Sequence, residues 1–565
     1  MGNSKRIIVI GGSAAGPKAA ARARRMDENA EITLFQKSPD LSMASCGYPY
    51  YVGGFFEDRN QLLCSPTGVV RDPGFFWNAK RVVTQVNTEV TRIDRKKKII
   101  EYKNLLTEER GVAEYDKLVI ATGAIPRRPP IPGIDLEGIT ALQSMADADY
   151  LRKIHDEGKI KKAVVIGGGL IGIETCEALH LAGVDITIVE LLPQLLTFLD
   201  SQIAQLVEKY VRTKSNVILQ NGVAAFLGEN GKLTGVKLQN GIEIPCELAV
   251  VAIGVSPNNI LAKEAGIEIG ARGGIKVNEY MQTSDSDIYA IGDCIEVPNL
   301  ITGNNVHAPY GDLANLQGRV AGENVIMGNT AKFPGTIQTG ICKVFDYGAG
   351  ATGLSENAAR LAGINNIETV VNASLDKPGF MQGELLITKL VVDRDKGTIL
   401  GAQVIGPGDV SKQIAIWAMA IKGKLTVDDM VNADLPYAPP FSLAIDHSIA
   451  SAHIMQNKLK GLFTGISALQ FKEMIDAKKS FFALDVRNPI EFEQMRLGIG
   501  ETLIPLGQLR NRINELPEDK GKEIVVYCKI SLRGYEAALI LQAFGYKNVM
   551  VLEGGIMAWP FDREK

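Results

Sequence analysis

The stretch KAVVIGGGLIG, residues 162–172, decides the fold of this chain. Its apolar run predicts a buried strand, and Gly167, Gly169 and Gly172 have the G-x-G-x-x-G spacing of a tight turn that opens a helix. Residues 185–190, DITIVE, predict another strand. Strand, helix and strand in this order predict a parallel sheet with helices on its faces.

A turn of this kind can bind a dinucleotide, because backbone N–H groups and the positive end of the helix dipole meet a pyrophosphate there. Glu190 ends the second strand, where it can accept hydrogen bonds from a ribose 2′-hydroxyl. Its charge repels a 2′-phosphate, so we expect NADH to be preferred over NADPH. The alternative is a turn with a purely structural role. The strand, the helix and Glu190 all stand at the spacing of a dinucleotide-binding motif, which favours a nucleotide-binding site.

The same pattern opens the chain. Residues 6–16 read RIIVIGGSAAG, followed by a predicted helix over 19–25 and a strand over 31–35. Ser13 stands in place of the second glycine and Gln36 in place of the ribose carboxylate, so a structural unit remains an alternative here. Two such units imply two nucleotide cofactors, or one dinucleotide and one cosubstrate.

Length and composition narrow the class of protein. A chain of 565 residues is long enough for about three to five domains. Its 61 basic and 64 acidic residues balance to a net charge of −3, which gives no reason to expect a nucleic-acid or membrane partner. Seven cysteines without a CxxC pair and five scattered histidines argue against a disulfide framework and a metal site. We expect a cytoplasmic protein with reduced thiols.

Later segments add further elements. Residues 115–123 read as a strand that ends in a turn. Residues 287–294 contain a strand that ends at Gly292-Asp293, where the carboxylate can hydrogen-bond a polyol hydroxyl. Antiparallel strands are predicted over 385–392 and 398–405, followed by a helix over 410–422. After residue 458, strands over 481–487, 523–528 and 549–552 alternate with helices and predict a separate small α/β domain.

Taken together, these motifs resemble the pyridine nucleotide–disulfide oxidoreductase family over roughly residues 1–455. The resemblance implies FAD on the first unit, with Asp293 on the ribityl chain, NAD(P)H on the second unit, and a C-terminal dimerisation domain. The cofactor-binding residues that it implies are Gly11, Gly12, Ser13, Ala14, Ala15, Gly16, Gln36, Lys37, Ser42, Ala121, Thr122, Gly123, Gly167, Gly169, Leu170, Ile171, Gly172, Glu190, Gly254, Gly292, Asp293 and Ala314.

Many members of that family carry a CxxxxC pair after the second strand, but residues 41–51, LSMASCGYPYY, contain only Cys46. A single thiol cannot form an internal disulfide, so its oxidised form must be a mixed disulfide, a persulfide or a sulfenic acid. The segment resembles the coenzyme A–disulfide reductase branch, which includes persulfide reductases and NADH oxidases and peroxidases. The alternative is that Cys46 is a small buried hydrophobe.

Residues 435–440, LPYAPP, also match this branch, in which the tyrosine reaches the partner subunit's active site. Tyr437 is therefore a candidate proton donor or orienting group for Cys46 of the other chain, and packing at a proline-rich turn is the alternative. Residues 378–383, PGFMQG, depart from the branch pattern and lack its second tyrosine, which argues against simple CoA-disulfide reduction. A pocket lined by Phe380 and Met381 would favour a smaller, softer sulfur substrate. Candidate CoA contacts are Lys18, Arg22, Ser42, Ser45 and Arg71.

In the C-terminal domain, residues 528–534 read CKISLRG between a strand and a helix. Backbone N–H groups of this loop, the helix N-terminus and Arg533 can stabilise a thiolate or persulfide on Cys528. With Glu491 and residues 553–559, the domain resembles a single-domain rhodanese over 466–565, a family that transfers sulfane sulfur through a cysteine persulfide. A phosphatase is the rival interpretation, but its loop normally has one residue more between Cys and Arg.

The sequence therefore predicts an α/β protein with two nested Rossmann-like domains, an α+β dimerisation domain and a rhodanese-like domain. The expected boundaries are 1–113 and 251–333 for FAD, 114–250 for NAD(P)H, 334–457 for dimerisation, 458–465 for a linker and 466–565 for the rhodanese-like domain.

The expected function is FAD-dependent, NADH-driven reduction of a persulfide, a polysulfide or CoA persulfide by a homodimer or a larger oligomer, with release of hydrosulfide. CoA-disulfide reductase, NADH oxidase or peroxidase, and a redox-sensing scaffold are the alternatives.

Overall fold

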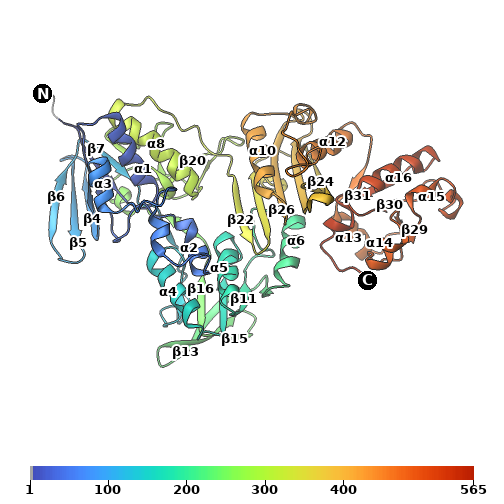
Figure 1. The fold of residues 1–565 in the computed structure, drawn as a ribbon, viewed down its shortest axis with the longest axis horizontal. Helices are drawn as coiled ribbons and strands as arrows, with labels where there is room; N and C mark the ends of the chain where they lie inside the picture. The colour runs from blue at the N-terminus through green and yellow to red at the C-terminus, as the bar shows by residue number, and fades with distance from the viewer. Residues whose placement is uncertain (1–3) are drawn as a thin grey trace. The chain divides into compact units, whose positions relative to one another are not determined.

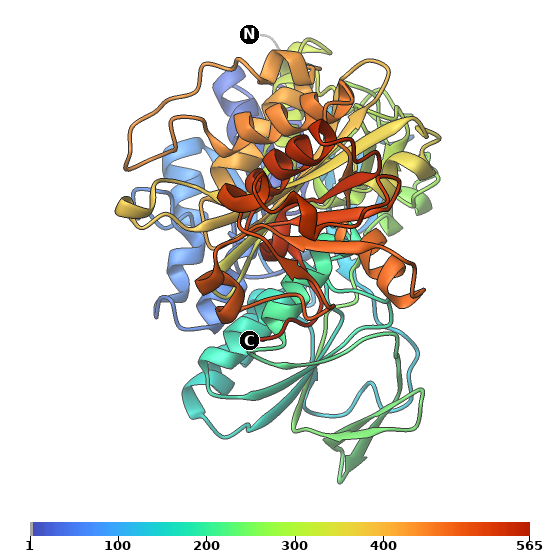
Figure 2. The same ribbon diagram turned by 90° about the vertical axis from the view of Figure 1, so that its right-hand side faces the viewer.

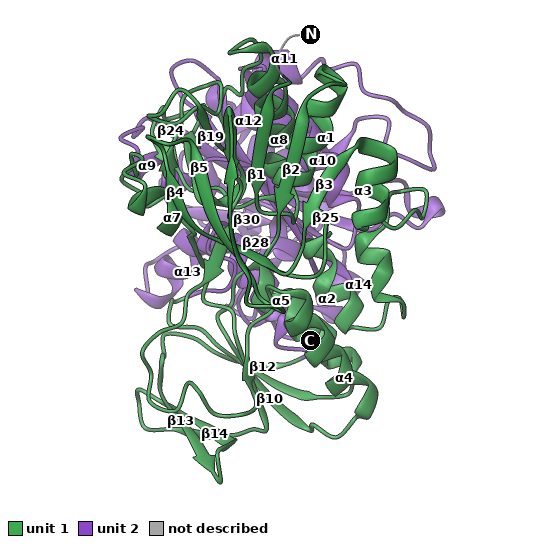
Figure 3. Ribbon diagram, turned by 90° about the vertical axis from the view of Figure 1, so that its left-hand side faces the viewer, with its two compact units in different colours: residues 1–193, 215–336 green, residues 194–214, 337–565 purple. Residues whose placement is uncertain are grey.

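The computed structural model describes residues 4–565, and its internal contacts divide the chain into two compact units (Figures 1 and 3). Unit 1 comprises residues 1–193 and 215–336, and unit 2 comprises residues 194–214 and 337–565. The domain boundaries expected from the sequence remain predictions.

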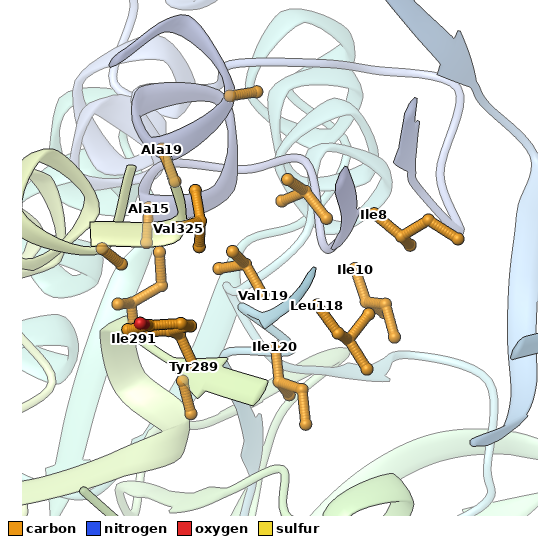
Figure 4. Packing of buried hydrophobic residues seen from close by; sticks show 14 of the residues in the cluster. Ile8, Ile10, Ala15, Ala19, Leu118, Val119, Ile120, Tyr289, Ile291 and Val325 are labelled. Carbon is orange, nitrogen blue, oxygen red and sulfur yellow. The ribbon is translucent and has the colours of Figure 1, made fainter. Parts of the chain in front are cut away.

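The first sheet of unit 1 is parallel and has the strand order β19-β7-β1-β2-β3. Helices α1 and α8 pack against each other beside it, because Gly318 and Gly322 of α8 leave no room for a side chain against the α1 backbone. Figure 4 shows the aliphatic core of this layer, with Ile8, Val119 and Ala19 among its members. The elements are β1 (Arg6–Ile10), α1 (Ala15–Met26), β2 (Glu31–Phe35), β3 (Val82–Gln85), β7 (Lys117–Ile120), β19 (Ile288–Ala290) and α8 (Gly311–Met327).

The second sheet of unit 1 is also parallel and has the order β12-β11-β10-β16-β9. It lies between segments of the first sheet in the sequence, so the predicted nesting of two Rossmann-like units is confirmed. Its elements are β9 (Ile139–Thr140), α4 (Met145–Glu157), β10 (Lys162–Ile166), α5 (Leu170–Leu181), β11 (Asp185–Val189), β12 (Asn216–Ile218) and β16 (Leu248–Val251).

Smaller elements complete unit 1. Two three-stranded antiparallel sheets are formed by β4 (Thr88–Asp94), β5 (Ile99–Asn104) and β6 (Arg110–Glu114), and by β13 (Val223–Glu229), β14 (Lys232–Leu238) and β15 (Glu243–Pro245). Short pairings involve β8 (Ala124–Pro126), β17 (Val255–Pro257), β18 (Ile275–Lys276), β20 (Ile295–Pro298) and β21 (Asn305–Val306). The short helices are η1 (Ser45–Gly47), α2 (Tyr48–Val52), η2 (Arg59–Leu63), α3 (Pro73–Lys80), α7 (Ile260–Glu264) and η3 (Gly292–Cys294).

Helix α6 (Ser201–Val211) follows β11 in the sequence, yet it belongs to unit 2. The Asp200 carboxylate, just before the helix, accepts a hydrogen bond from Gln403 (2.7 Å) and lies 3.1 Å from the Lys389 ammonium group. At the other end of the helix, Tyr210 stacks on Tyr347 with ring centroids 4.0 Å apart. A helix from the predicted nucleotide-binding segment is therefore held by side chains of unit 2.

The middle of unit 2 is an antiparallel sheet with the order β22-β23-β26-β25-β24, which leaves β24 at one edge. The predicted antiparallel strands and the helix over 410–422 are confirmed. The elements are β22 (Gly340–Val344), β23 (Tyr347–Gly353), α9 (Glu356–Leu361), β24 (Ile367–Leu375), η4 (Gly379–Met381), β25 (Leu385–Asp393), β26 (Ile399–Gly406), α10 (Val410–Lys422), α11 (Val427–Met430) and α12 (His447–Leu459).

The C-terminal domain of unit 2 faces the viewer in Figure 2. Its sheet is parallel, with the order β27-β31-β30-β28-β29, and the predicted alternation of strands and helices is confirmed. The elements are β27 (Gly465–Ile466), α13 (Ala468–Asp476), β28 (Phe482–Asp485), α14 (Pro489–Gln494), β29 (Thr502–Leu503), α15 (Leu506–Leu509), η5 (Ile513–Glu515), β30 (Ile524–Tyr527), α16 (Leu532–Ala543), β31 (Val549–Leu552) and η6 (Gly555–Ala558). Across residues 4–565, no helix combines the length and apolar character needed to cross a bilayer.

We predict that His447, the first residue of α12, makes the stability of unit 2 fall in acid. Its ring is buried and lies 2.6 Å from Ser374 Oγ and 2.7 Å from Thr388 Oγ1. Burial lowers its pKa to about 4, while Asp446 and Asp376 oppose the shift and Lys412 adds to it. The unfolded ring takes up its proton near pH 6.5, so stability is present above that value. As the pH falls to about 4, roughly 3 kcal/mol is lost.

Hydrogen exchange of peptides covering α12 and β24, corrected for the intrinsic rate, measures this loss between pH 6.5 and pH 4. His447→Gln should flatten the pH dependence. His155→Gln, which alters a histidine in unit 1, should leave it unchanged. If His447→Gln retains the full pH dependence, another group is responsible.

Candidate functional site

The turn after β1 brings a helix close to a strand. Gly11 has φ +108°, and a Cβ there would lie 2.0 Å from the Ala121 carbonyl oxygen. A Cβ at Gly16 would lie 1.9 Å from the Gly11 carbonyl oxygen, so neither position has room for a side chain. Ser13 is exposed and has no positive φ, which explains why the chain tolerates serine in place of the second glycine.

The turn after β10 repeats this geometry. Gly167 has φ +108°, and a Cβ there would lie 2.4 Å from the Ala252 carbonyl oxygen. A Cβ at Gly172 would lie 2.0 Å from the Gly167 carbonyl oxygen, whereas no atom of the described chain lies within 4 Å of such a position at Gly169. The start of α5, with Leu170 and Ile171, is therefore open on the Gly169 side, where a pyrophosphate can approach the backbone.

Gln36 and Glu190 occupy equivalent positions in the two units. The Gln36 Oε1 accepts a hydrogen bond from the Gly12 N–H (2.8 Å), and the Glu190 Oε2 accepts one from the Gly168 N–H (2.7 Å). Each side chain thus holds its glycine turn, but only the second one carries a charge. Lys37, beside Gln36, forms a surface ion pair with Glu89.

The end of β7 is hydrogen-bonded to the segment that follows β17. Thr122 Oγ1 donates a hydrogen bond to the Asn258 carbonyl oxygen (2.6 Å), and the Asn258 N–H donates one to the Gly123 carbonyl oxygen (2.9 Å). Gly123 and Gly254 both have positive φ, and the space around a Cβ at either is open. Sequence reasoning missed Asn258, because its partner is more than a hundred residues away in the chain.

Asp293 lies in η3, against the starts of α1 and α8. A Cβ at Gly292 would lie 3.1 Å from that of Ala15 and 3.8 Å from that of Ala314. Burial raises the pKa of Asp293, although His307 opposes the shift. Within residues 4–565 no group hydrogen-bonds this carboxylate, so it is available to a polyol hydroxyl. This unpaired carboxylate, beside the start of α1 at the first glycine turn, fits a flavin dinucleotide.

Cys46 lies in η1, and the N-terminus of α8 approaches its sulfur. A Cβ at Gly311 would lie 3.5 Å from Cys46 Sγ. Ser42 has φ +55°, and its N–H donates to the Gly12 carbonyl oxygen, which ties the Cys46 loop to the first glycine turn. The residue reaches the surface, yet shielding of its sulfur raises the pKa of the thiol, as do the nearby carboxylates Glu174, Asp293 and Asp312.

The thiol also lies close to the second nucleotide unit. Tyr50, on α2 directly after η1, donates a hydrogen bond to Glu174 of α5 (3.1 Å). A Cβ at Gly53 would lie 3.2 Å from the Ala178 Cα, so the end of α2 packs tightly on α5. Sequence reasoning missed Tyr50 and Glu174. Glu174 lies two residues after Gly172, the last glycine of the motif. This position is the one feature of the sequence that could have marked Glu174 as a site residue.

The candidate CoA contacts are only partly brought together. Lys18 and Arg22 lie on one face of α1, where Lys18 packs against Gly318 and Arg22 pairs with Glu323. Burial and the neighbouring Arg22 and Arg319 lower the pKa of Arg25, so this face of α1 and α8 gathers cations that the sequence did not group. Ser42 and Ser45 flank the Cys46 turn. The Arg71 guanidinium donates to the carbonyl oxygens of Leu63 and Cys64 instead.

In unit 2, Tyr437 lies on the loop between α11 and α12 with 54% of its surface exposed. Phe441, on the same loop, and Phe380, in η4, are also exposed. Because Tyr437 and Cys46 belong to different units, the role of Tyr437 remains a prediction.

Cys528 follows β30 and is buried at the base of its loop. Its carbonyl oxygen accepts a hydrogen bond from the Ile556 N–H (2.9 Å). Arg533 forms a two-pronged ion pair with Glu491, with both N–O distances 2.7 Å, and this pairing lowers the pKa of Glu491 to about 2. Ser531 has φ +90°, a strained conformation for any residue except glycine.

Three family models match the chain. They are the pyridine nucleotide-disulphide oxidoreductase model over residues 5–308, its dimerisation domain over residues 339–449, and a rhodanese-like domain over residues 467–560. The chain therefore belongs to the FAD-dependent pyridine nucleotide–disulfide oxidoreductases, which use NAD(P)H, and it carries a dimerisation domain and a C-terminal rhodanese-like domain.

The chain is similar to a solved structure and to two named relatives. A solved structure of an NAD-dependent persulfide reductase from A. fulgidus is 40% identical, with a TM-score of 0.93, and the match covers 98% of this chain and 100% of that one. An NADH oxidase of Methanocaldococcus jannaschii is 33% identical over 78% of this chain and 96% of that protein. An NAD(P)H coenzyme A polysulfide/persulfide reductase of Pyrococcus horikoshii is 32% identical over 80% of this chain and 98% of that protein.

We predict that Ser531→Gly stabilises the C-terminal domain by about 1 kcal/mol, because glycine relieves the strain at φ +90°. The Ser531 hydroxyl makes only a long hydrogen bond, 3.4 Å, to the Leu552 carbonyl oxygen, so little is lost with it. Ser531→Ala is the matched control, since it removes the hydroxyl and keeps the strain. Chemical unfolding followed by the fluorescence of Trp559 measures the effect, and equal stabilities of the Gly and Ala variants would contradict it.

Proposed function

We propose that this protein uses NADH to reduce the sulfane sulfur of persulfides and polysulfides, including CoA persulfide, and releases hydrosulfide. The observation that carries the proposal is the placement of the two thiols. Cys46, without a second cysteine in its turn, lies between two nucleotide-binding turns, and Cys528 lies in a rhodanese-type loop of the same chain. Similarity to the persulfide reductase of A. fulgidus over both units supports the proposal.

Cys46 acts as the nucleophile in the proposed reaction. Its thiolate attacks the sulfane sulfur of R–S–SH, R–S⁻ leaves with the electrons of the broken S–S bond, and Cys46 then carries a persulfide. Two electrons from NADH and two protons convert this persulfide into the Cys46 thiol and hydrogen sulfide. A bound flavin supplies the route for those electrons from the nicotinamide to sulfur. Overall, R–S–SH, NADH and one proton give R–SH, H₂S and NAD⁺.

The residues around Cys46 exert opposing effects on the thiolate. Burial and the carboxylates of Glu174, Asp293 and Asp312 raise its pKa, whereas the N-terminus of α8 at Gly311 favours negative charge on the sulfur. We propose that Tyr437 of the partner subunit donates a proton or orients the substrate at this thiol in a homodimer. The dimerisation domain supports this assignment.

The cations on α1 and α8 support CoA as the carrier of the persulfide. Lys18, Arg22, Arg25 and Arg319 concentrate positive charge on helices that begin beside the flavin turn and the thiol, as the phosphates of CoA require. Similarity to the coenzyme A polysulfide/persulfide reductase of Pyrococcus horikoshii points the same way.

In the rhodanese-like domain, Cys528 receives sulfane sulfur as a persulfide, and Arg533 stabilises its negative charge. Glu491 fixes the Arg533 guanidinium through its two-pronged ion pair. We propose that the domain supplies sulfane sulfur to the flavin site.

We predict that Cys46→Ser lowers NADH-dependent hydrogen sulfide release from glutathione persulfide and CoA persulfide at least about a hundredfold, because the nucleophile is lost. Cys528→Ser should keep these rates within about twofold but lose hydrogen sulfide release when thiosulfate is the sulfur source. Anaerobic assay of hydrogen sulfide and NADH consumption measures both. Full turnover in Cys46→Ser would refute the mechanism.

An NADH oxidase is the second candidate, favoured by the similarity to the Methanocaldococcus jannaschii protein. It predicts that oxygen or hydrogen peroxide is reduced through a Cys46 sulfenic acid and that Cys528 is not required. That match covers 78% of this chain, whereas the persulfide reductase match covers 98%, which favours the sulfur reaction. A higher kcat/KM with oxygen than with either persulfide would reverse this order.

We propose that NADH is preferred over NADPH because Glu190 places a carboxylate at the ribose position of the second turn. Glu190→Gln should raise kcat/KM for NADPH about tenfold, since the like charge that repels a 2′-phosphate is gone. The amide oxygen still accepts the Gly168 N–H, although the acceptor of the Leu192 N–H is lost, so kcat/KM for NADH should fall by less than kcat/KM for NADPH rises. Steady-state kinetics with both nucleotides measures this, and unchanged NADPH kinetics would show that another group sets the preference.

A further inference from the structure

Strand β24 leaves one row of backbone groups without a neighbouring strand, because it is the edge of the antiparallel sheet. An edge N–H that is buried needs another acceptor. The Val371 N–H finds one in the carboxylate of Glu553, 3.0 Å away, in the C-terminal domain of the same unit. A side chain of the rhodanese-like domain thus occupies the position that a sixth strand would take at this residue.

The Glu553 carboxylate is buried, and burial raises its pKa. Its other oxygen accepts a hydrogen bond from the ammonium group of Lys458, at the end of α12 (2.6 Å). Lys458 also donates to the Thr369 carbonyl oxygen (2.7 Å) and lies 3.0 Å from Glu368, both on β24. Without Glu553, Lys458 would therefore still have two partners on β24, and no buried cation would be left unpaired.

The two residues after Glu553 face in different directions. A Cβ at Gly554 would lie 3.0 Å from Val371 Cγ1, on the dimerisation domain, whereas one at Gly555 would lie 2.6 Å from the carbonyl oxygens of Cys528 and Lys529. Both glycines have positive φ. This segment therefore touches the edge strand on one side and the sulfur loop on the other.

The residues that follow hold the sulfur loop directly. The Ile556 N–H donates to the Cys528 carbonyl oxygen (2.9 Å), and the Met557 N–H donates to the Lys529 carbonyl oxygen (3.1 Å). Residues 553–557 thus form a bridge of five residues between Val371 of the dimerisation domain and the Cys528 loop. The sequence resemblance assigned residues 553–559 only to the rhodanese pattern and gave Glu553 no contact outside that domain.

We propose that Glu553 is a positioning residue that fixes the Cys528 loop to the edge strand of the dimerisation domain, so that sulfane sulfur leaves Cys528 for the flavin site from a fixed position. The inference rests on the proposed function and adds the element that couples its two reactions. In the coupled step the persulfide on Cys528 gives its outer sulfur to a thiolate, either Cys46 or a carrier thiol such as CoA. The Cys528 thiolate leaves, so no electrons are needed until the flavin site reduces the new persulfide.

The test compares the full-length wild-type protein with Glu553→Ala, and with Glu564→Ala as the matched control. Glu564 pairs with Arg496 inside the C-terminal domain and touches neither the bridge nor β24. Three quantities are measured: persulfide loading of Cys528 from thiosulfate by intact mass, NADH-dependent hydrogen sulfide release from free glutathione persulfide, and single-turnover release from preloaded Cys528 with CoA present. Deuterium uptake of the peptide covering β24 is followed in parallel.

Glu553→Ala should slow release from preloaded Cys528 at least about tenfold, while loading and release from free persulfide stay within about twofold. Uptake at β24 should rise, because the Val371 N–H loses its acceptor, and Glu564→Ala should match the wild type throughout. Unchanged single-turnover release in Glu553→Ala would overturn the inference. A parallel fall in loading would also overturn it, because Glu553 would then shape the loop itself.

Failure of the proposed function gives a different pattern, in which the wild type itself releases no hydrogen sulfide from preloaded Cys528. The anchoring is then judged on deuterium uptake alone. Increased uptake at β24 in Glu553→Ala with normal Cys528 loading would support it, and wild-type uptake would overturn it.

Discussion

The close approach of each glycine turn to the strands around it is the constraint on which the flavin and nicotinamide sites depend. Gly16 packs on the Gly11 carbonyl, and Gly172 packs on the Gly167 carbonyl, with no room for a Cβ at any of the four. This contact sets the start of α1 and of α5 at the carboxyl end of its sheet. The pyrophosphate positions follow from it, because the helix N-termini then point at the space where a pyrophosphate binds.

The position of Cys46 is set by the two nucleotide-binding units of unit 1, which meet at this thiol, rather than by its own short helix. Its loop is tied to the first turn through Ser42, and the following helix α2 packs on α5 of the second unit through Gly53 and Tyr50. A thiol at this junction lies beside both nucleotide sites, which is the arrangement that electron transfer from a nicotinamide to sulfur requires. The same convergence gathers three carboxylates around the sulfur.

Local sequence patterns predicted part of the regular elements. The bounds of β2, β31 and α10 match those expected, and α1 starts earlier than predicted because Pro17 is tolerated in a first turn. The contacts that join distant segments were not predictable. The pairs Asp200–Gln403, Tyr50–Glu174 and Val371–Glu553 each link residues more than a hundred positions apart, and nothing in the flanking sequence marks them. Helix α6 shows the result, since it lies within the expected NAD(P)H segment 114–250 and its contacts lie in unit 2.

The two nucleotide-binding turns have similar backbone geometry, but Glu190 of the second turn carries a charge where Gln36 of the first does not. Gln36 and Glu190 both accept an N–H from their glycine turn. The second Glu190 oxygen also accepts the Leu192 N–H, whereas the amide nitrogen of Gln36 donates to Ser38 Oγ. Beyond these backbone contacts, the charge of Glu190 acts on the nucleotide that binds there. A neutral amide can hydrogen-bond a ribose hydroxyl without repelling a phosphate. This suits a cofactor that stays bound and is recognised through many other contacts. A carboxylate discriminates against a 2′-phosphate, which matters where nucleotides exchange at every turnover and compete for the site.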